Sequence, residues 1–132
     1  MKTSRILLAW VPMLLLAVAN GAARDLIYGQ WIGRLRAHQM STIILVMVLW
    51  SYIGLFTKKN PFRSPEQAML IGFLWALLTL GFEFGFGIYR GMPWQQILSD
   101  YDLAAGRLWL LIPVTLVCAP PLWFHLRNRR QN

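Results

Sequence analysis

The sequence predicts an all-α membrane protein with four transmembrane helices in a single domain, residues 1–132. Hydrophobic residues make up 57% of the chain and charged residues only 14%, which is too apolar for a soluble domain of this length. Four apolar stretches are each long enough to cross a hydrocarbon core of ~30 Å at a rise of about 1.5 Å per residue. None of them alternates with period two, which argues against a membrane β-barrel. The predicted spans are residues 6–23, 40–57, 67–89 and 108–126.

The first apolar stretch has a second interpretation. Lys2 and Arg5 precede an apolar run that reaches the small residues 17–19, a pattern that also fits a secretory signal peptide with its cleavage site. The run continues through Ala22 and Ala23, which gives it the length of a membrane span. We therefore expect it to be retained as the first transmembrane helix.

Most basic residues fall on one side of the four-span arrangement, and this predicts its orientation. Of the 13 Lys and Arg residues, eight lie near the termini and in the loop 58–66, where Glu66 is the one acidic residue. The positive-inside rule places this side in the cytoplasm, so we expect a bacterial inner-membrane protein with both termini on the cytoplasmic side. Short basic clusters at helix ends also explain the net charge of +8, and no nucleic-acid partner is expected. The eight residues are Lys2, Arg5, Lys58, Lys59, Arg63, Arg127, Arg129 and Arg130.

The two outward connections are amphipathic rather than loop-like. In each, apolar residues recur at positions i, i+3, i+4 and i+7 while charged and amide side chains fall elsewhere. This pattern predicts two helices that lie in the membrane interface, with Trp and Tyr at the level of the lipid headgroups. The first stripe is Tyr28, Trp31, Ile32 and Leu35, and the second, which follows Pro93, is Trp94, Ile97, Leu98 and Tyr101.

The similarity of the two outward helices suggests a parallel repeat of two hairpins. An offset of 66 residues superimposes the two stripes and also aligns Arg24 with Arg90. Such units would be related by an axis along the membrane normal. The aligned spans share little identity, so chance similarity between two apolar hairpins is the alternative. At this offset two basic residues face two acidic ones, which predicts an attraction between the outward helices. These residues are Arg34 and Arg36 in the first helix and Asp100 and Asp102 in the second.

An acidic residue inside the third span, Glu83, marks the candidate functional site. It lies about 24 Å along that span from the cytoplasmic end, where a carboxyl group is costly unless it is paired, protonated or facing water. Nearby basic residues would neutralise it, either in a structural ion pair or in an outward-facing polar site that binds a ligand. The predicted ligand-binding or ion-pair site consists of Glu83, Arg24, Arg34, Arg36, His38, Arg90, Asp100, Asp102 and Arg107.

Small residues beside Glu83 predict close helix packing. Gly81 and Gly85 form a pair four residues apart, which lets helix backbones approach where lipid offers no hydrophobic driving force. Cys118 is expected to be a small apolar packing residue in the last span. No Cys or His lies at metal-ligand spacing, because His38 and His125 fall near opposite membrane faces. Neither a metal nor a cofactor is therefore expected.

Three motifs lie in the second half of the chain: Glu83-Phe-Gly-Phe-Gly through Trp94, Ile97-Leu-Ser-Asp-Tyr-Asp102 and Gly106-Arg107-Leu-Trp109. Together they resemble the signature of a family of small four-span bacterial membrane proteins of unassigned function. The resemblance covers a small part of the chain and implies the four-span fold. It carries no activity and adds no catalytic or binding residue.

The patterns favour a non-enzymatic membrane protein that binds or transports a small or amphipathic ligand, or a lipid, at the outward site. Four spans enclose little space, so transport is expected to need a homo-oligomer. An accessory or scaffold subunit of a larger membrane complex, docking through the glycine pair, is the alternative. A third hypothesis is an enzyme that acts on lipid, but the chain has no nucleophile elbow, metal motif or phosphate-binding glycine loop. Its acid and base groups would be Glu83, Asp100, Asp102 and His38.

Overall fold

The computed structural model describes residues 3–99 and 110–131 of the chain. All regular secondary structure in these residues is helical. Four long helices are connected by shorter helical segments and turns. In chain order the elements are α1 (Thr3–Ala23), the π-helix η1 (Arg24–Tyr28), α2 (Gly29–Ile32), α3 (Arg34–Lys59), α4 (Pro65–Tyr89), α5 (Trp94–Ser99) and α6 (Leu111–Gln131).

Among the described residues, three helices are long and apolar enough to cross a membrane, which is consistent with the prediction of transmembrane helices. They are Thr3–Ile32, Leu35–Lys59 and Pro65–Tyr89. The fourth span is not confirmed. α6 begins at Leu111, and its second half carries Arg127 and Arg129, so its apolar part among the described residues is shorter than that of the other three helices.

Large apolar side chains cover the outside of the long helices. Leu15 and Val18 on α1, Met47 on α3 and Leu70 on α4 are each more than half exposed. Soluble proteins rarely expose apolar surface on this scale, whereas helices in a membrane are apolar around most of their circumference. The outer surface therefore fits contact with lipid.

The first predicted outward helix does not form as one element. α1 continues through η1 and α2 to Ile32, and the chain then turns at Gly33, whose φ of 89° favours glycine. α3 begins at the next residue, Arg34, so Trp31 and Leu35 lie on different helices. The prediction of one amphipathic helix was wrong because the apolar spacing runs across a glycine that breaks the helix.

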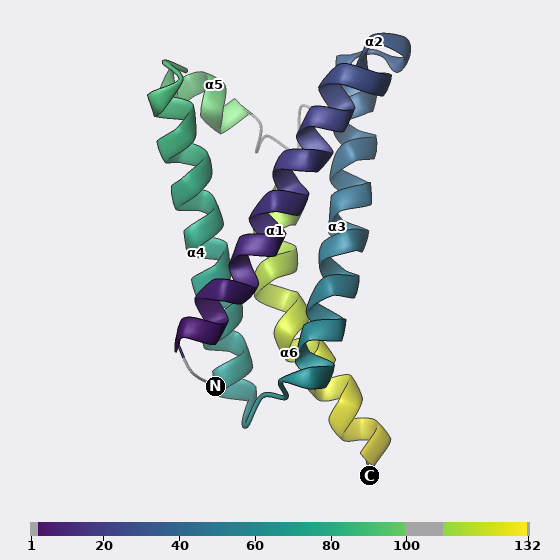
Figure 1. The fold of residues 1–132 in the computed structure, drawn as a ribbon, viewed down its shortest axis with the longest axis vertical. Helices are drawn as coiled ribbons and strands as arrows, with labels where there is room; N and C mark the ends of the chain where they lie inside the picture. The colour runs from purple at the N-terminus through teal and green to yellow at the C-terminus, as the bar shows by residue number, and fades with distance from the viewer. Residues whose placement is uncertain (1–2, 100–109, 132) are drawn as a thin grey trace.

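The second predicted outward helix is present but short. α5 has six residues and begins after Pro93, whose carbonyl oxygen accepts hydrogen bonds from the backbone N–H groups of Gln96 and Ile97. Ile97 is buried against the end of α4, whereas Trp94 is exposed. Figure 1 shows α5 lying across the end of α4. Tyr101, the last residue of the predicted stripe, lies outside the described residues.

The repeat of two hairpins is not confirmed. In the first hairpin a single glycine, Gly33, separates α2 from α3. In the second hairpin α4 ends at Tyr89, a turn follows at Gly91 with a φ of 80°, and then come α5 and residues 100–109. The two connections therefore differ in length and in the elements that they contain.

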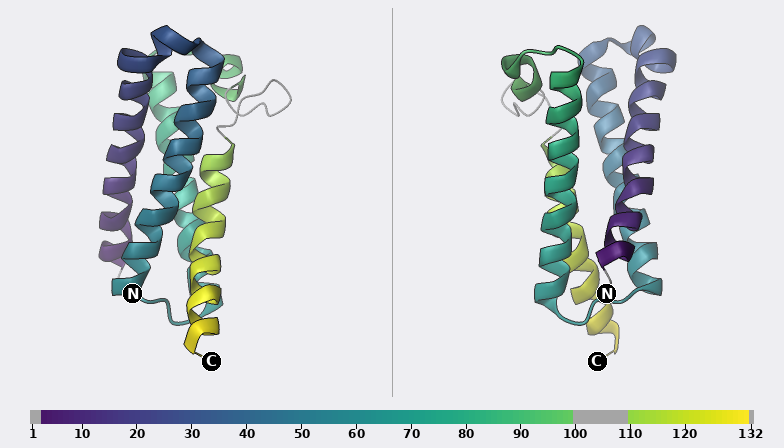
Figure 2. Two further views of the ribbon diagram at one scale, coloured as in Figure 1. Left: turned by 90° about the vertical axis from the view of Figure 1, so that its right-hand side faces the viewer. Right: turned by 60° about the vertical axis from the view of Figure 1, so that its left-hand side comes forward.

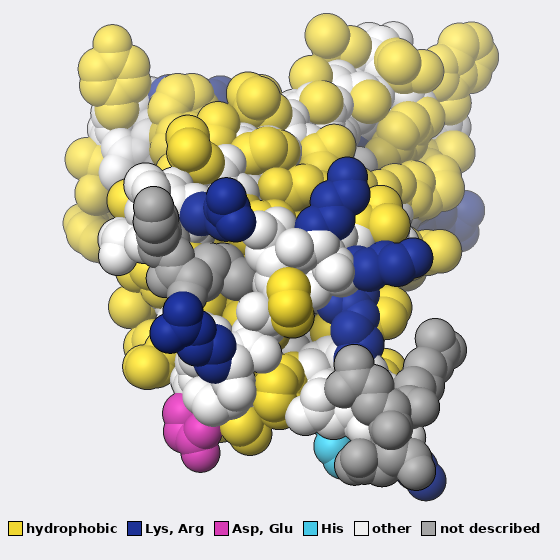
Figure 3. All heavy atoms as spheres, turned by 60° about the horizontal axis from the view of Figure 1, so that its bottom comes forward, with side chains coloured by type: hydrophobic (Ala, Val, Ile, Leu, Met, Phe, Trp, Pro, Cys, Tyr) yellow, Lys and Arg dark blue, Asp and Glu magenta, His cyan; other side chains and the backbone are white. Residues whose placement is uncertain are grey.

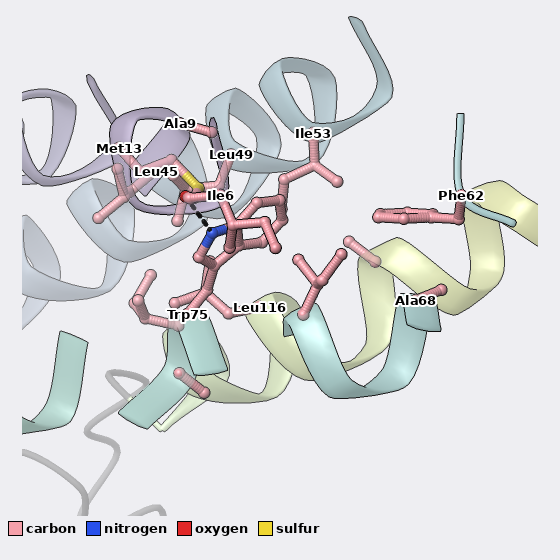
Figure 4. Packing of buried hydrophobic residues seen from close by; sticks show 14 residues of the cluster. Ile6, Ala9, Met13, Leu45, Leu49, Ile53, Phe62, Ala68, Trp75 and Leu116 are labelled. Atoms are coloured by element: carbon pink, nitrogen blue, oxygen red, sulfur yellow. Dashed lines mark hydrogen bonds between the residues drawn. The ribbon is translucent and has the colours of Figure 1, made fainter. Parts of the chain in front are cut away.

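The helices pack most closely at the end of the bundle where the chain begins and ends. We call this end the basic end, because basic side chains gather there, and the opposite one the cleft end, because a cleft lies there. Trp75 of α4 is fully buried, and its ring packs edge-on against Phe56 of α3. Figures 1 and 2 show α1 and α4 close together toward the basic end and apart toward the cleft end. The hydrophobic core (Figure 4) consists of Ile6, Ala9, Met13, Leu45, Leu49, Ile53, Phe62, Ala68, Ile71, Trp75, Ala76, Ile112, Leu116 and Ala119.

Hydrogen bonds between helices add to this packing. The indole N–H of Trp75 donates to the backbone carbonyl of Ile6 at 3.0 Å, which joins α4 to α1. The indole of Trp10 donates to the hydroxyl of Thr79 at 3.0 Å and joins the same two helices. Each such bond contributes about 0.6 kcal/mol within a membrane. Others run from Tyr52 to the Ala9 carbonyl at 2.8 Å, from Asn20 to the Ser41 hydroxyl at 2.7 Å and from Trp123 to the Trp50 carbonyl at 3.1 Å.

Two glycines let α6 approach its neighbours. A Cβ atom at Gly72 of α4 would lie 2.6 Å from the carbonyl oxygen of Leu116, and one at Gly54 of α3 would lie 2.6 Å from the ring of Trp123. Neither position has room for a larger side chain. Small residues at helix crossings allow this kind of close backbone contact in membranes, and α6 thereby packs against both α3 and α4.

Basic side chains gather at the basic end (Figure 3). The start of α1, the end of α3, the following loop and the end of α6 all meet there (Figure 2). Arg5 donates a hydrogen bond to the side chain of Asn60 at 2.8 Å, which connects the start of α1 to that loop. Which side of the membrane this end faces stays a prediction. The described basic residues are Arg5, Lys58, Lys59, Arg63, Arg127 and Arg129.

Candidate functional site

A cleft of about 1090 Å³ lies toward the cleft end of the bundle. Its walls come from the second half of α1, η1, α2, the first part of α3, the end of α4, α5 and the start of α6. On α4 the deepest lining residue is Thr79, which accepts the hydrogen bond from Trp10. The cleft therefore begins where the hydrogen-bonded contact between α1 and α4 ends.

The chemistry of the lining changes along the cleft. Its deep part is formed by the apolar side chains of Met13, Leu14, Leu49, Ile112 and Leu116. Toward the mouth the lining becomes polar and charged. The polar groups there are Arg24, Asp25, Gln30, His38, Glu83, Arg90, Gln96 and Ser99.

The cleft brings together four of the residues that the sequence predicted for the site. Arg24, His38, Glu83 and Arg90 all line it. Arg36 is exposed and is not among the lining residues. The predicted attraction between the two outward helices is not tested and stays a prediction. The residues that lie outside the described part are Asp100, Asp102 and Arg107, together with the side chain of Arg34.

Arg24 is held on its wall by a residue that sequence reasoning did not place in the site. Its Nε donates to Oδ1 of Asp25 at 3.0 Å, and the side chains of Arg24 and Asp25 are 21% and 69% exposed. An exposed pair of this kind contributes at most about 1 kcal/mol. The adjacency of the two residues in the sequence was the available signal. The contact occupies one of the several N–H donors of the guanidinium.

Arg90 lies on the opposite wall, directly after the end of α4. Its guanidinium carbon is 5.5 Å from the centroid of the Phe86 ring, a cation–π contact. The Phe86 ring stacks in turn on Phe82 at 5.6 Å. A cation is also favoured at this position because the C-terminal end of a helix carries partial negative charge.

Glu83 and His38 both line the cleft but differ in burial. Glu83 is half-buried on α4, and His38 on α3 is buried. Each has an interaction partner. The carbonyl oxygen of His38 also accepts a hydrogen bond from the Thr42 hydroxyl at 2.8 Å. Glu83 therefore lies on the cleft side of α4, and whether it stabilises the fold or binds a ligand stays a prediction.

Gly81 and Gly85 do not touch another helix in the part of the chain that the structure describes. A Cβ atom at either position would meet no atom within 4 Å. The close approach on this part of α4 is at Gly87, where a Cβ atom would lie 2.9 Å from Ile97 of α5. The predicted packing role of Gly81 and Gly85 therefore stays a prediction for a contact with another chain.

The described residues contain no group of three or more His, Cys, Asp or Glu side chains that could hold a metal ion. Cys118, which we expected to be a packing residue, is exposed on α6. That expectation was wrong because the neighbouring prolines and apolar residues of α6 do not reveal from the sequence which face of the helix meets α3 and α4.

Comparison of the chain with protein-family models, with curated proteins and with solved structures finds no match. The described residues are helical and include three apolar helices of membrane length. This fold is that expected of a membrane protein. Its most distinctive feature is the cleft that opens where these helices separate.

Proposed function

We propose that the protein is an integral protein of the bacterial inner membrane that binds an amphipathic molecule in the cleft and catalyses no reaction. α6 is the fourth span, and both termini lie in the cytoplasm. The orientation is supported by the positive-inside rule, because the basic residues of α1, α3 and α6 meet at the end opposite the cleft. The cleft then opens toward the outer face of the membrane.

The packing of α6 supports its role as a fourth span. Leu116 of α6 meets α4 at Gly72, and Trp123, two helical turns further along, donates its hydrogen bond to the carbonyl of Trp50 on α3. Figure 2 shows α6 running alongside both helices. A helix that packs against two membrane-spanning helices over this length lies in the bilayer with them.

One observation carries the proposed ligand class: a single cavity is apolar at Leu49, Ile112 and Leu116 and charged at Arg24 and Arg90. A wholly polar solute would leave the deep walls without suitable contacts, and a wholly apolar one would desolvate the charged groups without compensation. An amphipathic molecule satisfies both parts. The volume of about 1090 Å³ is just above the range of about 300–1,000 Å³ that is usual for small-molecule sites.

The space beside Gly81 and Gly85 favours a second candidate function, a scaffold subunit of a larger membrane complex. A helix of another chain would find room to approach α4 closely at these two residues. Measurement of the mass of the detergent-solubilised protein, corrected for bound detergent, separates the two functions. A ligand-binding protein purifies as a monomer or a defined homo-oligomer, and a scaffold co-purifies with other chains.

Native mass spectrometry of the purified protein with added phosphatidylglycerol tests the proposed function. We expect the wild type to bind the lipid with a defined stoichiometry. Ala17→Trp, which places a large side chain in the cleft, should lower the occupancy several-fold. Leu15→Trp is the matched control, because Leu15 is 63% exposed on the same helix and does not line the cleft. Equal occupancy in all three proteins would contradict the proposal.

A further inference from the structure

We infer that the occupant of the cleft is a phospholipid of the surrounding leaflet, which enters sideways between α1 and α4 and is held by its phosphate group between Arg24 and Arg90. This assignment rests on the proposed function and names its ligand and its route of entry.

The hydrogen bonds between α1 and α4 leave the parts of the two helices nearer the cleft end free to separate. These bonds are donated by Trp75 and Trp10, and neither lies nearer the cleft end than Thr79. Beyond that level both helices line the cleft, α1 with residues 13–22 and α4 with residues 79–87, and Figure 1 shows them apart. An acyl chain can therefore pass between α1 and α4 without breaking a hydrogen bond described between them.

The rim of this opening is apolar on both sides. Val18 of α1 and Phe86 of α4 line the cleft and are also 54% and 47% exposed. A side chain that both lines a cavity and is exposed stands at its edge. Apolar edges at membrane depth are in contact with lipid chains, so this side of the cleft opens to the bilayer rather than to water.

The two arginines are suited to a phosphate group. Guanidinium groups bind phosphate oxygens through paired N–H donors. Arg24 is largely enclosed by its wall and uses its Nε for Asp25, and it lines the same cleft as Arg90. Arg90 is exposed at the mouth and forms no ion pair with another described residue. Both follow directly after the long helices that form the sides of the opening.

Charge and polarity together favour a phospholipid over a single-chain acid or a soluble phosphate ester. Arg24 and Arg90 lie on opposite walls and match a group with several anionic oxygens. Two carboxylates, Asp25 and Glu83, line the cleft as well, and Asp25 is paired with Arg24.

The apolar depth of the cleft, from Met13 to Leu116, offers little to a water-soluble molecule. The hydroxyl of Thr79, which lines this part, already bonds Trp10 and the carbonyl of Trp75. The lipid would therefore keep its chains among the apolar residues and its phosphate at the mouth.

Binding of three probes by native mass spectrometry tests the assignment of the phosphate. The probes are phosphatidylglycerol, a diacylglycerol with the same chains, and water-soluble glycerol phosphate added as a competitor. We expect the wild type to bind phosphatidylglycerol about tenfold more tightly than diacylglycerol, with no displacement by glycerol phosphate. The double variant Arg24→Gln and Arg90→Gln should lose this preference. Arg63→Gln with Arg129→Gln, at the basic end, should keep it.

The outcomes separate the inference from the proposed function. Equal affinity for phosphatidylglycerol and diacylglycerol in the wild type would overturn the role of the arginines and leave an amphiphile site in place. Displacement by glycerol phosphate would overturn the bilayer as the source of the ligand. Failure of both lipids to bind would overturn the proposed function itself.

The route of entry is tested by the rate at which lipid exchanges. Val18→Trp with Phe86→Trp narrows the rim, so it should slow the exchange of spin-labelled phosphatidylglycerol several-fold in the reconstituted protein, measured by electron paramagnetic resonance. Leu15→Trp with Leu70→Trp adds the same side chains at exposed positions outside the cleft and should leave the rate unchanged. An unchanged rate in the rim variant would overturn sideways entry.

Discussion

The two halves of α4 use similar residues for different purposes. In the half toward the basic end, Gly72 meets the backbone of α6 and Trp75 is fully buried. In the half toward the cleft end, a Cβ atom at Gly81 or Gly85 would meet no described residue within 4 Å, and Phe86 is half-exposed. Glycine and aromatic residues occur in both halves, so composition does not distinguish them. The difference is whether a neighbouring helix lies opposite.

We propose that this difference assigns stability to the half of α4 at the basic end and ligand binding to the half at the cleft end. The hydrogen bonds that join α4 to α1 are confined to Trp75 and Thr79 among the described residues. Two charged residues near the end of α4 line the cleft: Glu83, on its last third, and Arg90, directly after it. Binding regions are commonly drawn from the less stable part of a structure, because tight packing would exclude a ligand.

Substitution of the two kinds of glycine should produce the largest contrast between the halves. In Gly72→Leu the new Cβ would lie 2.6 Å from the Leu116 carbonyl oxygen and 3.0 Å from that of Val117, so α6 has to move away from α4. We expect the free energy of unfolding to fall by about 3 kcal/mol, measured by denaturation in SDS. Gly81→Leu should change it by less than about 0.5 kcal/mol. A large loss in Gly81→Leu would show that this face is packed after all.

Replacement of a tryptophan by phenylalanine should give the next largest difference in stability between the two halves. Trp75→Phe removes a buried indole and its hydrogen bond to the Ile6 carbonyl, so we expect a loss of about 2 kcal/mol in the same unfolding measurement. Trp94→Phe, at a side chain that is 56% exposed at the cleft end, should cost less than about 0.5 kcal/mol. Similar losses in both variants would remove the distinction between a packed half and an open one.

A smaller effect is expected from hydrogen bonds between α1 and α3. Ser41 is buried and its hydroxyl accepts a hydrogen bond from Asn20 of α1, so Ser41→Ala should cost about 0.6 kcal/mol. Ser51 lies on the same helix, but its exposed hydroxyl donates to the carbonyl of Met47 within α3, and Ser51→Ala should be close to neutral. Equal thermal stability of the two variants would show that the Asn20 contact does not hold α1 to α3.

The smallest effect on stability is expected at Glu83. Because it is half-buried in an open wall, Glu83→Gln should change the free energy of unfolding by less than about 0.5 kcal/mol. Removal of a negative charge from the cleft should tighten the binding of phosphatidylglycerol about threefold, since that charge opposes a phosphate group. Unchanged lipid affinity together with lowered stability would return Glu83 to a purely structural role.

The sequence predicted the helices better than the contacts between them. Apolar length alone identified three membrane-length helices, because the hydrocarbon core sets that length. The outward connections were harder. The stripe from Tyr28 to Leu35 has helical spacing, yet Gly33 divides it between two helices. A hydrophobic pattern does not report the φ angle of a glycine inside it.

The candidate site was predicted in part. Depth along the helices and opposite charge were enough to group Arg24, His38, Glu83 and Arg90, which line one cleft. The same reasoning missed Asp25, whose role depends on the local path of η1. It also proposed packing at Gly81 and Gly85 rather than at Gly72, because the spacing of small residues does not show which face has a helix opposite it.

An experimental density map of the protein in lipid nanodiscs tests the central claim most directly. We predict continuous density for a phospholipid between α1 and α4, with its chains beside Leu49 and Leu116 and its phosphate within hydrogen-bonding distance of Arg90. A map in which α1 and α4 pack together along their whole length, leaving no space between Val18 and Phe86, would contradict it.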